Sequence, residues 1–193
     1  MDRSTSSVDI QLVLLSDDAT HIPVDQIDNA ALHLLVAETL EDWPVDSTAG
    51  LDLTAAKYDR LPECGISVFS NGQLLAEPGC CATLSGVAAL HDFLLQPTPG
   101  KHTLFTGHDV MQFVAVRLAP SNTNVEILTI GPNGKETSFR LTSEQATALA
   151  DELSSDIETL IGRVTLALPS DVLGQDRRSV AEYLLGMDGE RYW

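Results

Sequence analysis

The sequence predicts an α+β fold in which an antiparallel sheet, built from hairpins, has helices packed on one face. Two turns with an Asn-Gly centre, Asn71-Gly72 and Asn133-Gly134, each separate two short apolar runs. Asn-Gly supplies the two positive-φ residues that a type I′ turn needs, so both sites predict β-hairpins. The helical layer is indicated by apolar residues that recur at helical spacing after residue 83 and, over a longer stretch, after Thr142.

The N-terminal region predicts a strand followed by a helix. The apolar run Asp9–Leu15 is strand-like, and Ser16-Asp17-Asp18 marks a turn. Pro23 suits a first helical turn, and the acidic residues after it favour the start of a helix that ends near Asp42. The predicted buried stripe of this helix contains Ile27, Ala30, Ala31, Leu34 and Leu35. A strand over Leu32–Glu38 is the competing interpretation.

The middle of the chain predicts a loop, the first hairpin and a short helix. Residues 45–64 are a loop in which Leu51–Ala56 form either an extended edge or a helical turn. The hairpin strands are Ile66–Phe69 and Gln73–Ala76, and Gly79 breaks the chain after them. The helix is capped by Thr83 or Ser85 and ends near Leu95, before two prolines. Its apolar stripe contains Val87, Leu90, Phe93 and Leu94.

Four more strands are predicted between residues 102 and 141. His102–Thr106 is followed by a turn at Gly107-His108-Asp109, and Val110–Leu118 has apolar residues on both faces, which is typical of a strand covered on both sides. Val125–Ile130 and Thr137–Leu141 form the second hairpin. In its last strand Thr137, Phe139 and Leu141 alternate with polar residues, which predicts one buried face.

The clearest helix begins after Thr142, with Gln145 at the spacing of a capping box. It should pack on the sheet and stop at Gly162. Its apolar stripe contains Ala146, Leu149, Ala150, Leu153, Ile157, Leu160 and Ile161. We therefore predict one α+β domain over residues 1–162 and a C-terminal appendage over 163–193. The appendage contains a possible strand at Val164–Leu168, a short helix capped by Ser179, and the aromatic end Tyr192-Trp193.

Charge is the most unusual property of the chain, with 28 acidic and 11 basic side chains and a net charge of −17. Residues 1–60 contain 12 acidic and 3 basic residues, and residues 141–193 contain 10 acidic and 4 basic residues. Residues 61–140, with 6 acidic and 4 basic residues, are nearly neutral, so the two ends of the chain carry most of the charge. This field repels nucleic acid and anionic membranes and attracts basic proteins, although an acidic surface also serves solubility. We find no signal-like N-terminus or bilayer-length apolar run, so a cytoplasmic location with reduced thiols is expected.

No catalytic, metal or cofactor motif is recognisable. All three cysteines and three of the five histidines lie between Cys64 and Asp109. Cys80 and Cys81 are adjacent, and neither C-x₂-C nor H-x₃-H spacing occurs. A nucleophile elbow, a P-loop and a dinucleotide-binding glycine motif are also missing. A small metal or thiol enzyme using Cys80, Cys81, His91 and His108 is therefore only an alternative.

The order of elements carries a resemblance. A hairpin, Pro78-Gly79-Cys80-Cys81, a short helix, Gly107-His108-Asp109, a strand-rich segment and a long acidic helix follow one another over roughly residues 64–162. This order resembles small bacterial proteins of the immunity type, encoded beside polymorphic or contact-dependent toxins. The resemblance implies a non-enzymatic protein without a cofactor that binds and neutralises a basic protein partner, with a cognate toxin as the expected target.

Acidic residues outside the apolar stripes are the expected partner-binding groups, because they carry the field of the two charged ends. They are Asp17, Asp18, Glu41, Asp42, Asp151 and Glu152. The other interpretation is a structural component of a larger bacterial assembly, docked through its aromatic C-terminus. Loss of function on truncation after Leu168 would favour that interpretation over inhibition through the acidic residues.

Overall fold

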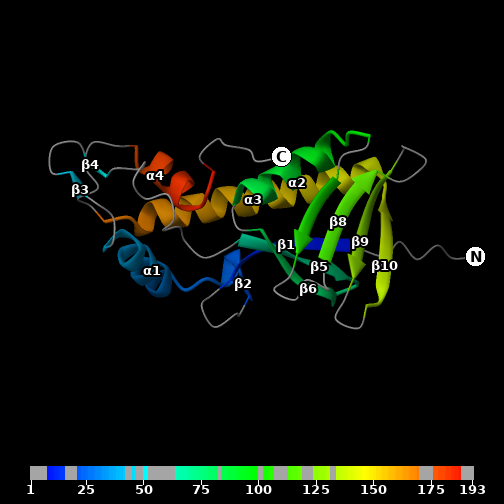
Figure 1. The fold of residues 1–193 in the computed structure, drawn as a ribbon, viewed down its shortest axis with the longest axis horizontal. Helices are drawn as coiled ribbons and strands as arrows, with labels where there is room; N and C mark the ends of the chain where they lie inside the picture. The colour runs from blue at the N-terminus through cyan, green and yellow to red at the C-terminus, as the bar shows by residue number, and fades with distance from the viewer. Residues whose placement is uncertain are drawn as a thin grey trace, which may run out of the picture.

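The computed structural model confirms an α+β fold with an antiparallel sheet (Figure 1). The structure describes residues 8–15, 21–41, 45–46, 50–51, 64–81, 84–99, 102–106, 113–118, 124–130, 134–169 and 176–187. The predicted turns at residues 16–18, 107–109 and 120–122 and the aromatic end lie outside these residues.

The main sheet has eight strands in the order β10-β9-β8-β7-β6-β5-β1-β2. Every pair of neighbours in it is antiparallel. The strands are β1 (Val8–Leu15), β2 (His21–Pro23), β5 (Cys64–Ser70), β6 (Gln73–Cys81), β7 (His102–Thr106), β8 (Phe113–Leu118), β9 (Val125–Ile130) and β10 (Glu136–Leu141). A separate two-stranded sheet contains β3 (Val45–Asp46) and β4 (Gly50–Leu51).

Both predicted hairpins are present. Asn71 and Gly72 have φ angles of 50° and 75°, as a type I′ turn requires. In β10 the side chains alternate between exposed and covered as predicted, with Leu141 buried. The predicted break at Gly79 is wrong, because β6 continues to Cys81 after a register shift and Gly79 pairs with Ile66. Pairing with β5 therefore outweighs the local preference of glycine.

Two helices cover one face of the sheet (Figure 1). They are α2 (Leu84–Leu95) and α3 (Ser143–Ala167), and their buried residues share one core cluster with those of β1, β5, β8 and β9. The predicted stripes of both helices are buried. The capping box is also confirmed: Thr142 N–H donates to Gln145 Oε1 over 2.9 Å, and Gln145 N–H donates to Thr142 Oγ1 over 3.2 Å.

α3 does not stop at Gly162. It has 25 residues and ends at Ala167, so the predicted strand at Val164–Leu168 is also wrong. Val164, Ala167 and Leu168 continue the buried stripe, and their burial outweighs the cost of about 1 kcal/mol for a glycine within a helix. The predicted division at residue 162 falls inside this continuous helix.

The helix α4 (Arg177–Leu184) follows, and its residues Val180, Ala181 and Leu184 belong to the same core cluster. Its cap is Asp176 rather than the predicted Ser179. Arg178 N–H donates to Asp176 Oδ1 over 3.2 Å, and the Ser179 hydroxyl donates to the other carboxylate oxygen. Asp176 lies one residue before the helix, where a carboxylate can accept from the first turn.

We expect Gly162→Ala to raise the free energy of unfolding by about 0.5–1 kcal/mol, because Gly162 lies within α3 and alanine favours a helix. A Cβ atom added there would meet nothing within 4 Å. Gly72→Ala is the matched control, since its Cβ would also be unobstructed but its φ of +75° strains any L side chain. In urea unfolding we expect a higher midpoint for Gly162→Ala and a lower midpoint for Gly72→Ala than for the wild-type protein. A lower midpoint for Gly162→Ala would contradict a continuous helix at this position.

The first predicted helix is confirmed over the competing strand, as α1 (Asn29–Glu41). Its buried face differs from the predicted stripe: Leu32 and Val36 are buried, whereas Leu34 is 61% exposed. Because α1 is apolar on several sides, the sequence pattern does not determine which side docks on α3. Pro23 lies at the end of β2 rather than in a helical turn, and the 3₁₀ turn η1 (Val24–Gln26) follows it.

The sheet and the remaining helices occupy different ends of the molecule. In Figure 1, α3 runs behind the sheet and continues beyond it, and α1 and α4 lie beside this extension. β1 lies near the other edge of the sheet from β10 and contacts α3. This arrangement brings the N-terminal strand against the long helix, where the Leu12 N–H donates to Asp156.

Candidate partner-binding site

The six predicted partner-binding residues are not brought together by the described part of the structure. Asp17, Asp18 and Asp42 lie outside the described residues, and Glu41 is the last residue of α1. Asp151 and Glu152 are exposed on α3. Of these two, Glu152 lines a groove and Asp151 does not.

The groove lies where β1, η1 and α3 meet, and we call it the acidic groove. It has a volume of about 240 Å³. Four of its lining side chains are carboxylates, contributed by three elements: Asp9, Asp25, Glu152 and Asp156. The remaining lining residues are Ile10, Gln11, Leu12, Pro23 and Val24.

Local structure explains why these carboxylates converge. Glu152 and Asp156 are four residues apart on α3 and therefore lie on one helix face. Asp9 alternates with the buried Ile10 along β1, so its side chain points away from the core. It still lines the groove, and its charge acts on both Glu152 and Asp156. Arg163 donates hydrogen bonds to the carbonyls of Val24 and Ile27 and so holds η1, which carries Asp25, against α3.

The groove disfavours its own negative charges. Burial raises the pKa of Asp156, and Asp25 and Asp9 raise it further, although the Leu12 N–H that donates to Asp156 Oδ2 over 3.4 Å lowers it. Burial also raises the pKa of Glu152, with further contributions from Asp9 and Asp156. The ion pairs among the described residues include none of these carboxylates. The groove is thus suited to an added cation.

The geometry favours an organic cation over a metal ion. In the part of the chain that the structure describes, no group of three or more His, Cys, Asp or Glu side chains could hold a metal. The four carboxylates surround a groove instead of converging on one point. The groove is also smaller than typical small-molecule pockets of about 300–1,000 Å³. A basic side chain is the ligand that this arrangement fits best.

We expect Glu152→Gln to raise the unfolding temperature at about pH 7, where the carboxylate is charged. Because the pKa of Glu152 is raised in the folded state, the folded state binds more protons than the unfolded state at pH values between the ordinary and the raised pKa. Stability therefore falls as pH rises through this window, and the variant escapes that loss. The gain should disappear near about pH 4, where both states are mostly protonated.

Asp151→Asn is the matched control for this pH series. It removes the same charge from the next residue of α3, which is exposed and does not line the groove. Thermal unfolding of both variants across the pH range separates a local effect from the general relief of negative charge. Equal gains for both variants would contradict a desolvated site at Glu152.

The cysteine and histidine window shows no comparable site in the described residues. Cys64 is buried, and its Cα pairs in register with that of Cys81. His91 lies on α2, where its Nδ1 is 3.1 Å from Asp92 Oδ1. His108 and the side chains of Cys80 and Cys81 are outside the described residues. The described part of this window therefore contains no group of side chains with metal-ligand geometry.

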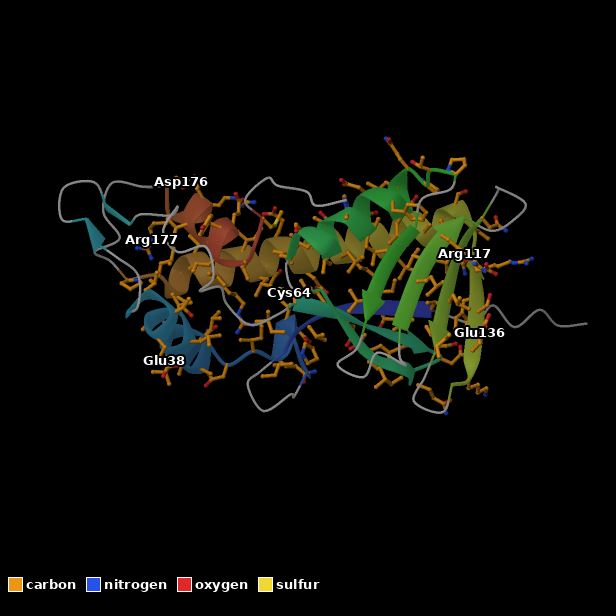
Figure 2. The ribbon with its side chains drawn as sticks, viewed as in Figure 1. Glu38, Cys64, Arg117, Glu136, Asp176 and Arg177 are labelled. Carbon is orange, nitrogen blue, oxygen red and sulfur yellow. The ribbon has the colours of Figure 1, made fainter. Side chains whose placement is uncertain are left out.

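A second charged cluster is internally satisfied. Glu126 of β9 is only 6% exposed and accepts hydrogen bonds from Ser138 Oγ at 2.8 Å and Arg117 Nε at 3.1 Å. The Ser138 bond lowers the pKa of Glu126, and Arg117 and Arg140 lower it further against the opposing effect of burial. Arg117 and Glu136 mark this end of the sheet in Figure 2. The negative charge of Glu126 is already balanced by Arg117 and Arg140, so we assign this cluster a role in the stability of the sheet.

Sequence reasoning missed Asp9, Asp25 and Asp156. The i, i+4 spacing of Glu152 and Asp156 is one available signal, because it places two carboxylates on one helix face. The convergence with Asp9 is not readable locally, since the hydrogen bond between Leu12 and Asp156 joins residues 144 positions apart.

In comparisons with known proteins, no family model, curated sequence or solved structure matched the chain. None of the described helices is both long enough and apolar enough to cross a membrane.

Proposed function

We propose that this protein is a cytoplasmic, non-enzymatic inhibitor that binds a basic protein partner, in the manner of a bacterial immunity protein with its cognate toxin. The observation that carries this proposal is the acidic groove, which four carboxylates line and in which none has an ion pair among the described residues. The net charge of −17 supports the same conclusion, because it draws basic proteins toward the whole molecule.

Binding would proceed in two steps. Long-range attraction by the acidic ends first accelerates encounter with a basic surface. A lysine or arginine side chain of the partner then enters the acidic groove and forms charge-assisted hydrogen bonds with Glu152 and Asp156. Because both pKa values are raised, this cation also relieves the repulsion inside the groove. Inhibition follows if the occupied surface covers the partner's active site.

The test is affinity capture of the native partner, followed by binding kinetics with matched variants. Glu152→Gln/Asp156→Asn neutralises two lining carboxylates, and Glu144→Gln/Asp151→Asn removes the same charge from exposed positions of α3 outside the groove. We expect the groove variant to weaken binding by about tenfold to a hundredfold and the control by much less. Association should slow as salt increases.

Neutralisation is tested separately by co-expressing the captured partner with each variant. The wild-type protein and the control should protect cells from the partner, and the groove variant should protect them less. Equal binding by both double variants, an association rate insensitive to salt, or a partner without a basic surface would falsify the proposal.

A further inference from the structure

The edge of the main sheet at β10 has no second strand beside it in the described part of the structure. β10 is the last strand of the sheet order and pairs only with β9. Its residues Glu136, Ser138 and Arg140 are exposed, and Thr137 and Phe139 between them are half-buried. An accessible edge of this kind can pair with another strand.

The backbone of Ser138 points out of this edge. The hydroxyl of Thr129 in β9 donates to the Thr137 carbonyl over 3.5 Å, which shows that this carbonyl points toward β9. Successive residues of a strand direct their N–H and C=O groups to opposite sides, so those of Glu136, Ser138 and Arg140 point away from β9. Among the described residues, no backbone hydrogen bond outside the sheet reaches these groups.

We propose that two copies of this chain pair antiparallel through β10, with the two-fold axis at Ser138, so that their sheets join into one. In this register Glu136 of each copy lies directly opposite Arg140 of the other, and Thr137 lies opposite Phe139. The two Ser138 residues exchange a pair of backbone hydrogen bonds. The interface is isologous, because the same strand supplies both sides.

Charge selects both the occupant and the register. Glu136 has no ion pair among the described residues. Arg140 is 64% exposed and lies 3.7 Å from Glu126, which Arg117 already holds at 3.0 Å. Opposite charges directly across an antiparallel pair stabilise it. Moving the axis by one residue, the smallest shift that keeps outward backbone groups opposite one another, removes both ion pairs.

The net charge of −17 does not exclude this contact. β10 belongs to the nearly neutral segment 61–140, and in Figure 1 it lies at the opposite end of the molecule from α1 and α4. Charges separated by more than about 10 Å are largely screened at 0.1 M salt. Because six residues form the contact, we expect a weak dimer with a dissociation constant between about 1 μM and 1 mM.

Charge reversal in the full-length chain tests the register, with sedimentation equilibrium as the measurement. Glu136→Arg places arginines opposite each other and Arg140→Glu places carboxylates opposite each other, so each variant alone should dimerise about tenfold to a hundredfold more weakly than wild type. Mixed together, the two variants restore both ion pairs and should form a heterodimer as tight as the wild-type dimer. Asp151→Arg, with the same charge change as Glu136→Arg at an exposed position of α3, should dimerise like wild type.

Three outcomes would overturn the inference. They are a wild-type chain that stays monomeric up to about 1 mM, a mixture of the two variants that dimerises no better than either alone, and a Ser138 amide whose hydrogen exchange does not slow as the dimer forms. The inference is independent of the proposed function, since the acidic groove lies at β1, η1 and α3. Glu152→Gln/Asp156→Asn should therefore dimerise like wild type, and partner capture tests the proposed function separately.

Discussion

Leu160→Ala is expected to lower the free energy of unfolding by about 2–5 kcal/mol, the range typical of a leucine truncated in a packed core. Leu160 is completely buried on α3 and belongs to the core cluster of the described residues. α3 contacts α1, α2, α4, β1 and β10, so a cavity at its buried face removes contacts in the centre of the fold. The loss of stability within that range depends on how far the surrounding side chains move to fill the cavity.

Leu166→Ala supplies the control for this prediction. Leu166 lies on the same helix but is 77% exposed, so its truncation changes helix propensity equally without opening a cavity. We expect a change of less than about 0.5 kcal/mol. Urea unfolding followed by far-ultraviolet circular dichroism gives both midpoints. Equal shifts for the two variants would mean that α3 does not bury the face assigned to Leu160.

Local chemistry made some elements predictable from the sequence. Asn71-Gly72 encodes its turn through two residues that tolerate positive φ, and the structure has both angles positive. Thr142 and Gln145 encode a helix start through a reciprocal pair of hydrogen bonds, and both bonds are present. In each case the determinant lies within four residues, so no knowledge of the rest of the fold is required.

Elements determined by distant packing were not predictable in this way. Gly162 is a reasonable helix stop, yet α3 continues because Val164 and Leu168 are buried. The buried face of α1 is determined by docking, which leaves Leu34 exposed. Likewise, Glu152 could be selected from the sequence as an exposed acid, but its neighbours in the groove come from β1 and η1. The candidate site is therefore a product of tertiary structure.

Arg177→Ala is expected to lower the free energy of unfolding by about 2–3 kcal/mol, because a charged donor to several carbonyls is lost. The guanidinium of Arg177 donates to the carbonyls of Thr165, Leu168 and Pro169 at 2.9, 2.7 and 3.0 Å. These carbonyls lie at the C-terminal end of α3, where the helix lacks partners for its last C=O groups and its dipole attracts a cation. Arg177 lies beside the α4 cap Asp176 in Figure 2.

Arg178→Ala is the matched control, since it removes the same side chain from the next residue. Arg178 forms ion pairs with Glu158 and Glu182, and exposed pairs of this kind contribute little to stability. Arg177→Lys should not restore the loss, because an ammonium lacks the planar fork that reaches several carbonyls. Hydrogen exchange should also accelerate in the last turn of α3 in Arg177→Ala. Unchanged exchange in that turn combined with a large loss of stability would place the role of Arg177 elsewhere than at the end of α3.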